Sequence, residues 1–200
     1  FRDVLGDSYI QMAKEKGMSA EELLSEEAEK VPAGSDGLMT VLDWLAPVDA
    51  RYKKGIMIGF DGRHTRGHIY RSILEAVAMT IKGHTEDMVN EVGVTLDKII
   101  ITGGGSNSDL FMQIFADVFN LPAVRNVVNG AAGLGSAICA AVATDVYGSF
   151  EEAVEGMVKI QDTFVPNPEN VELYKKMIPI YKDITVHTDE VLKKTYELFE

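Results

Sequence analysis

Hydrophobic and polar residues follow a helical spacing in the first thirty positions of the chain, and short apolar runs come after them. Gly17 stands where a helix over residues 1–17 would end, because glycine is favoured just past a helix C-terminus. Ser19 and Glu22 have the spacing of a capping box and predict a second helix to about Lys30. Beyond it we expect a turn at 33–37, a strand at 38–45, a polar loop at 47–54 and a strand at 55–60.

The middle of the chain changes to a longer helical repeat. A helix over residues 65–92 is predicted by an apolar stripe of Ile69, Ile73, Val77, Ile81 and Met88, and Gly93 ends it. The β-branched run at 98–102 is typical of a strand buried on both faces. Three glycines follow it, then a helix at 108–119 and a short strand at 123–128.

The last part of the chain is helical in pattern. Residues 131–146 form an apolar helix of small side chains, which favours close packing against a sheet or another helix. Amphipathic segments at 150–160 and 170–199 predict two more helices, separated by a proline turn. For both helices we favour burial of the apolar stripe against the rest of the chain. Alternating strands and helices place the chain in the α/β class, with a helical tail.

Composition and charge limit the kinds of molecule that the chain is expected to bind. The chain has 200 residues, with 31 acidic and 19 basic side chains and a net charge of −12, which argues against binding nucleic acid or an anionic membrane surface. No segment is long and apolar enough to span a bilayer, and no signal peptide is recognisable. The single cysteine, Cys139, suits a reducing cytoplasm. The chain opens without Met inside a helical pattern, so we expect a fragment of a longer protein.

The histidines do not form a recognisable metal motif. His64 and His68 are four residues apart, but no glutamate lies between them as in a zinc-protease helix. His68 stands near the expected start of a helix, where a histidine more often satisfies a backbone group than acts as a base. We therefore expect no metal site in this chain.

The most informative segment is the glycine turn after the predicted strand at 98–102. Glycine lets a ligand approach the backbone closely, and the helix N-terminus that follows offers free amide groups. The segment therefore predicts a nucleotide site, although a simple tight turn with a helix cap explains it equally well. It matches neither a Walker A loop nor a G-x-G-x-x-G fingerprint. The candidate nucleotide-binding residues are Gly103, Gly104, Gly105, Ser106, Asn107 and Ser108.

Two further segments have structural interpretations. Arg71 and Glu75 lie one helical turn apart, and a structural ion pair is favoured over a catalytic one. The small residues from Asn129 to Ala137 are favoured as a packing surface.

Four segments, in order along the chain, resemble the C-terminal lobe of the FGGY family of carbohydrate kinases, which includes xylulokinase, gluconokinase and glycerol kinase. They are the turn at 33–38, the signature-like stretch at 55–75, the glycine turn with its helix at 102–113, and the small-residue segment at 132–137. The signature-like stretch has Phe60 where a smaller aliphatic residue is usual. Over its whole length, the sequence pattern resembles xylulokinase more than glycerol kinase.

The resemblance implies an actin-like (ribonuclease H-like) ATPase fold, in which residues 1–200 form the nucleotide-binding lobe. An N-terminal lobe, absent from this chain, would bind most of the sugar and carry the aspartate general base, so no catalytic residue is expected here. The cofactors implied are ATP and Mg²⁺. Gly104 and Gly105 would pass close to the adenosine, and Ser108 would lie near its ribose or adenine. Ser106 and Asn107 would cap the helix, while Arg71 and Glu75 would support the site.

The chain also departs from the family pattern. The family's Gly-Glu-Arg element is replaced by Ala46-Pro47-Val48-Asp49-Ala50, which puts the choice of sugar in doubt, and a pentulose such as xylulose is our preference. This departure supports a second hypothesis, a non-catalytic or degenerate module acting in dimerisation or regulation. Another actin-like ATPase, such as a chaperone or a filament protein, is a further alternative. A homodimer that forms through the helical tail is another hypothesis that the sequence leaves open.

Overall fold

The computed structural model describes residues 5–199 of the chain. The first half contains, in order, helices α2 (Asp7–Glu15) and α3 (Ala20–Glu29), the 3-10 turn η1 (Ser35–Gly37), strands β1 (Met39–Val41) and β2 (Ile56–Ile58), and the long helix α4 (Arg66–Val92). These elements confirm the expected order, although both strands are shorter than the apolar runs that predicted them. Residues 1–4 of the first expected helix lie outside the described residues.

The second half contains strand β3 (Ile99–Ile101), the 3-10 turn η2 (Gly104–Asn107), helix α5 (Asp109–Phe119), strand β4 (Ala123–Asn126), helices α6 (Ala131–Ala143) and α7 (Phe150–Met157), strand β5 (Ile160–Phe164) and helix α8 (Pro168–Phe199). Strand β5 was not predicted, because three consecutive polar residues stand between its two apolar ends, so it lacks the alternation typical of a strand, and a helical pattern precedes it. The class is α/β, as expected.

The strands form two separate sheets. Strands β1 and β2 pair in an antiparallel manner. In the other sheet, β4 lies between β3, which is parallel to it, and β5, which is antiparallel to it. The carboxyl ends of β3 and β4 therefore lie side by side and lead into the turns that begin α5 and α6.

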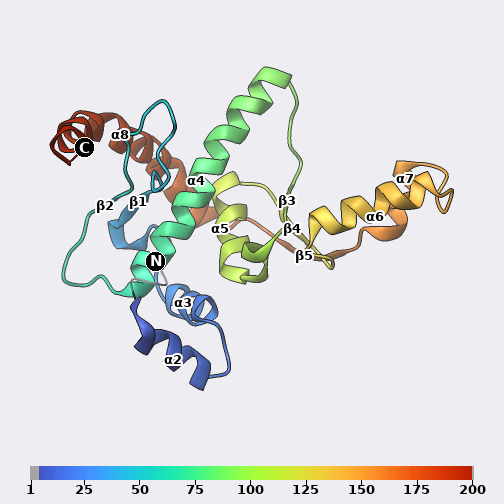
Figure 1. Cartoon of the computed structure of the whole chain (residues 1–200), viewed down its shortest axis with the longest axis horizontal. Coiled ribbons are helices and arrows are strands. Elements are labelled where there is room, and N and C mark those ends of the chain that lie inside the picture. Colours follow the sequence, from blue (N-terminus) through green and yellow to red (C-terminus); the bar gives the residue numbers. More distant parts are fainter. Residues whose placement is uncertain (1–4, 200) are drawn as a thin grey trace.

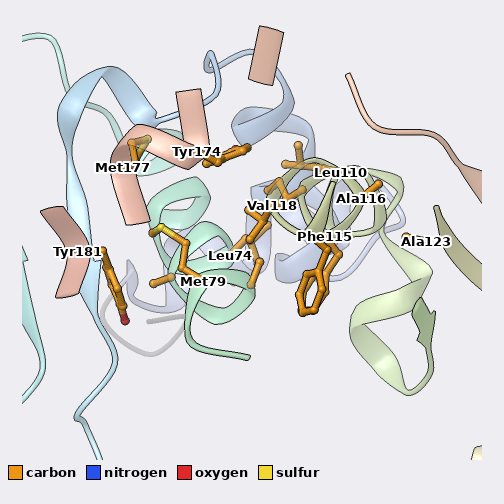
Figure 2. Packing of buried hydrophobic residues seen from close by; sticks show 14 of the residues in the cluster. Leu74, Met79, Leu110, Phe115, Ala116, Val118, Ala123, Tyr174, Met177 and Tyr181 are labelled. Carbon is orange, nitrogen blue, oxygen red and sulfur yellow. The ribbon is translucent and has the colours of Figure 1, made fainter. Parts of the chain in front are cut away.

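The main core lies where α4, α5 and the first half of α8 meet (Figure 1). Figure 2 shows Tyr174, Met177 and Tyr181 of α8 in the same cluster as Leu74 and Met79 of α4. Helix α4 is buried on almost every side from Gly67 to Met79, and its last three turns extend away from the core. The predicted stripe is therefore wrong in its outer part, because Ile81 and Met88 are exposed.

Helix α8 is held at its start by a buried carboxylate. Asp117 of α5 accepts hydrogen bonds from the Asn167 amide and from the side chains of Gln113 and Asn170, each at 2.7 Å. Val171, Tyr174, Met177 and Tyr181 are buried, whereas the apolar residues of its second half are largely exposed. The expectation that the whole tail would be buried against the chain is confirmed only for this first half.

Of two other burial predictions, one is wrong and one holds only in part. Strand β3 is at the edge of its sheet, and Ile100 is 55% exposed on the face opposite to α5, so this strand is not buried on both faces. Helix α6 projects with α7 from one end of the molecule (Figure 1), and Ile138 is its one buried residue among those described. Helix α6 contacts α7, so the expected packing against another helix is found on that side only, and the rest of α6 is largely exposed.

The N-terminus of α3 has the predicted capping box. The Glu22 amide donates to Ser19 Oγ at 3.1 Å, and the Ser19 amide donates to a Glu22 carboxylate oxygen at 2.6 Å. Because the cap satisfies amide groups that have no partner within the helix, Ser19→Ala is expected to lower the free energy of unfolding by about 1 kcal/mol. Urea unfolding measures this loss. The control Ser136→Ala, on an exposed face of α6, should cost nothing because alanine is the better helix former; equal losses in the two variants would contradict the prediction.

Candidate functional site

The glycine turn joins β3 to α5 in two steps. Gly103 has a positive φ of 88°, and residues Gly104–Asn107 then form one 3-10 turn before the α-helix begins. The helix cap is Ser108, whose Oγ accepts a hydrogen bond from the Phe111 amide at 3.3 Å. The sequence-based choice of Ser106 and Asn107 as caps is therefore wrong, because the 3-10 turn moves the start of the helix by one to two residues.

Ser106 and Asn107 instead join the turn to the loop after β4. The Ser106 hydroxyl is fully buried and donates toward the Gly103 carbonyl oxygen at 2.8 Å and Asn129 Oδ1 at 2.6 Å. Asn107 Oδ1 accepts from Asn129 Nδ2 at 2.8 Å. The turn is thus tied to its neighbour by side chains that local sequence pattern did not pair.

The glycines at 104 and 105 have different surroundings. A Cβ atom at Gly104 would meet no heavy atom within 4 Å, so the backbone there is open to a ligand. A Cβ atom at Gly105 would lie 2.8 Å from Cε1 of the Phe111 ring. Gly105 is therefore required for packing, whereas nothing in the described structure requires a glycine at 104.

An open cleft of about 650 Å³ lies between this turn and helix α3. Gly104, Gly105, Asn107 and Ser108 line one wall, and Tyr70 and Leu74 of α4 lie between the walls. Of the predicted site residues in the turn, Gly103 and Ser106 do not line the cleft. The opposite wall, from α3 and the residues before it, consists of Met18, Ser19, Glu21, Glu22, Ser25, Glu26 and Glu29.

The charge of the cleft is negative. Four of the residues on the α3 wall are glutamates, and Asp109 lies at the start of α5. Carboxylates accept hydrogen bonds from hydroxyl and amino groups, and they repel phosphate groups. The cleft is therefore better suited to the nucleoside end of a nucleotide than to its phosphates.

Arg71 and Glu75 lie behind the α3 wall. The Glu75 carboxylate is 1% exposed and accepts hydrogen bonds from Arg71 Nε, the Gly34 amide, the Ser35 hydroxyl and the Tyr174 hydroxyl, at 2.8 to 3.0 Å. Burial and the nearby carboxylate raise the pKa of Tyr174, so its hydroxyl stays a donor. Arg71 Nη1 donates to the Val31 carbonyl oxygen at 2.8 Å, just past the end of α3. The pair is thus a buried structural one, as expected.

His64 and His68 take part in backbone hydrogen bonds. His64 Nδ1 accepts from the Asp61 amide at 2.9 Å, and His68 Nδ1 accepts from the Thr65 amide at 3.2 Å. The expectation for His68 is confirmed. Within residues 5–199, no group of three or more His, Cys, Asp or Glu side chains is arranged to hold a metal ion.

Sequence reasoning missed Arg125. This residue of β4 is 8% exposed, and its guanidinium contacts both carboxylate oxygens of Asp162, a carboxylate oxygen of Asp109 and the carbonyl oxygen of Ser106. The guanidinium holds the pKa of Asp162 below its ordinary value. A lone arginine inside a short apolar strand was the available signal, but its partners lie 16 to 37 residues away and could not be paired from one sequence.

Comparison with known proteins extends this picture. Residues 8–144 match the model of the C-terminal domain of the FGGY family of carbohydrate kinases. The chain is 54% identical over 198 residues to the "Uncharacterized sugar kinase YgcE" of Escherichia coli K12, covering 98% of this chain and 40% of that protein. It is 30% identical over 173 residues to a xylulose kinase of Bacillus subtilis, covering 85% of this chain and 34% of that protein.

The solved structures give the same result. The xylulose kinase from Rhodospirillum rubrum superposes with a TM-score of 0.74 at 26% identity, over 87% of this chain and 35% of that one. This similarity confirms the actin-like ATPase fold, with its helical C-terminal tail. The chain spans about 40% or less of the length of these three proteins.

Proposed function

The chain belongs to the FGGY family of carbohydrate kinases, and from this we propose that it is the ATP-binding lobe of an enzyme that phosphorylates a sugar hydroxyl. The observation that carries the proposal is the cleft beside Gly104 and Gly105, at the carboxyl end of β3. In α/β folds, nucleotides bind at the carboxyl ends of parallel strands, where helix N-termini offer free amide groups.

In this proposal the adenosine lies between the glycine turn and helix α3. The open backbone at Gly104 lets the base or ribose approach, and Ser108 lies at the same wall. The glutamates of α3 accept hydrogen bonds from the amino and hydroxyl groups of the nucleoside. They disfavour phosphates, so the triphosphate extends out of the cleft toward the rest of the protein.

The chemistry follows the general pattern of phosphoryl transfer. An aspartate outside this chain takes the proton of the sugar hydroxyl, the sugar oxygen bonds to the γ-phosphorus, and ADP leaves. Mg²⁺ accompanies the phosphates of ATP. This chain's part is to bind and orient the adenosine, which lowers the entropy cost of aligning the reacting groups.

A pentulose such as xylulose is the substrate class that we propose. Its support is the similarity to proteins named as xylulose kinases, together with the sequence pattern. The loop that replaces the Gly-Glu-Arg element is a place where the sugar preference can differ, since Leu45 next to it is 94% exposed and Val48 within it is also exposed.

The proposed partner of this chain is the N-terminal lobe of the same protein. The exposed apolar face of α6 and the free edge of β3 are available to it. None of the helices between residues 5 and 199 has the length and apolar character needed to cross a membrane. A cytoplasmic location is proposed because the one cysteine, Cys139, is a free thiol.

The test is a comparison of the intact protein with the isolated chain. We expect the intact protein to convert ATP and a pentulose to ADP and a sugar phosphate, measured by mass spectrometry across a panel of sugars. The isolated chain should show no turnover, because the general base lies outside it.

Two outcomes would contradict the proposal. Saturable turnover by the pure isolated chain would show that the roles are wrongly assigned. An intact protein that binds no adenine nucleotide in calorimetry would favour the non-catalytic module instead, and release of inorganic phosphate without a sugar phosphate would favour another actin-like ATPase.

A further inference from the structure

Arg125 stands directly behind the wall of the cleft. Its Nη1 donates to the Ser106 carbonyl oxygen at 2.9 Å, and its Nη2 lies 2.9 Å from a carboxylate oxygen of Asp109. Ser106 belongs to the turn that forms one wall of the cleft, and Asp109 is the first residue of α5, which follows that turn. Arg125 itself does not line the cleft.

The direction of the guanidinium is fixed from the other side. The Asp162 carboxylate of β5 accepts hydrogen bonds from Arg125 Nε at 2.9 Å and from Arg125 Nη2. The guanidinium carbon of Arg125 lies 5.3 Å from the centre of the Phe164 ring. A two-pronged contact of this kind fixes the plane of the guanidinium, which a lysine cannot reproduce. The pairing of β4 with β5 therefore sets where the Ser106 carbonyl is held.

Asn129 holds the same turn from the neighbouring loop. Its backbone carbonyl accepts from the Gly103 amide at 3.1 Å, and its side chain contacts Ser106 Oγ and Asn107 Oδ1. Within the turn, the Ser106 amide and hydroxyl donate to the Gly103 carbonyl oxygen, and the Ser108 amide donates to the Gly105 carbonyl oxygen. The side-chain hydrogen bonds that tie the turn to the neighbouring strand and loop come from Arg125 and Asn129.

We infer that Arg125 and Asn129 are positioning residues for the nucleotide, acting through the Gly103–Ser108 turn without touching the ligand. The inference rests on the proposed function. A site whose backbone is held in the binding conformation avoids the cost of ordering it when the ligand arrives. Loosening the turn therefore weakens ATP binding and leaves sugar binding unchanged.

The test uses Arg125→Met and Asn129→Ala in the intact protein. Each is expected to raise the KM for ATP by roughly tenfold, with the KM for sugar within about twofold of the wild type. Hydrogen exchange of the amides at 103–109, followed by mass spectrometry, should become faster, while exchange in α3 stays the same. Arg125→Lys keeps the charge but loses the fork, and it should give an intermediate KM for ATP.

A matched control separates positioning from general loss of stability. Asp117→Asn weakens a different buried network, at the start of α8, and should lower the melting temperature without changing the KM for ATP. Having two variants keeps the test valid if one of them fails to fold.

The outcomes distinguish the inference from the proposed function. Unchanged exchange at 103–109 in both folded variants would overturn the positioning role, whatever the enzyme does. Faster exchange with an unchanged KM for ATP would overturn both the inference and the placement of the nucleotide. If the wild type has no kinase activity, the proposed function fails, and calorimetry with ADP then decides the role of Arg125: equal affinities of wild type and variant overturn it.

Discussion

The variant Glu75→Ala is expected to lose about 3–5 kcal/mol of unfolding free energy, the largest loss among the substitutions considered for this chain. The carboxylate is almost fully buried and accepts four hydrogen bonds from three parts of the chain. Its removal leaves the buried guanidinium of Arg71 without its charge partner and the Tyr174 hydroxyl without its acceptor. Breaking one half of a buried pair costs more than removing the whole pair, because the remaining charge is neither solvated nor compensated.

The measurement is urea unfolding of the same chain with and without the substitution. The matched control is Glu190→Gln, because Glu190 and Lys194 form an ion pair with the same spacing on α8, but both side chains are exposed. That variant should lose about 0.5 kcal/mol or less. A second test replaces both Arg71 and Glu75 by methionine, which should recover part of the loss of Glu75→Ala.

Two results would contradict this expectation. A loss for Glu75→Ala no greater than that for the exposed pair would mean that the buried network does not hold the turn at 34–35 and α8 against α4. A double variant less stable than Glu75→Ala would mean that the unpaired guanidinium is not the source of the loss.

The parts of the fold that could be predicted from sequence are those fixed by residues close together in the chain. The capping box at Ser19 and Glu22 involves residues three apart, and it fixes the start of α3. The glycine turn after β3 was predicted because strand, glycines and helix follow each other directly. The resemblance to the family placed these segments together in one known fold, which no local pattern could do.

The parts that could not be predicted depend on residues far apart. The capping role passed to Ser108 because one 3-10 turn precedes α5, and the position of that turn depends on Asn129 and Arg125. The burial of α6 was predicted only in part, because an apolar pattern shows that a helix needs a partner but does not show how much of its surface the partner covers, and α7 covers one side. Glu75 pairs with Arg71 as expected, because the two residues are one helical turn apart. Its hydrogen bond from Tyr174 could not be predicted, because 99 positions of sequence separate the two residues.

In the intact protein, Gly104→Val is expected to raise the KM for ATP by roughly 5- to 150-fold, with little change in the KM for sugar. The added side chain projects from a residue that lines the cleft into space that holds no protein atom within 4 Å. The folded state therefore accommodates it, and the cost falls on the ligand. An overpacked contact costs about 1–3 kcal/mol, which corresponds to this range in affinity.

The effect is measured by steady-state kinetics with each substrate varied in turn, and by the melting temperature of each variant. Gly83→Val is the matched control, because a Cβ atom there also meets open space, on α4 and outside the lining of the cleft. It should leave both KM values unchanged. Gly105→Ala should instead lower the stability, because its Cβ atom would press on the Phe111 ring.

These three glycine variants separate the possible roles of the turn. If Gly104→Val folds like the wild type and leaves the KM for ATP unchanged, the adenosine does not pass Gly104, and the cleft beside α3 is not its site. If the KM for sugar rises instead, the turn faces the sugar. Only a selective rise in the KM for ATP, absent from Gly83→Val, agrees with a nucleoside lying against the open backbone at Gly104.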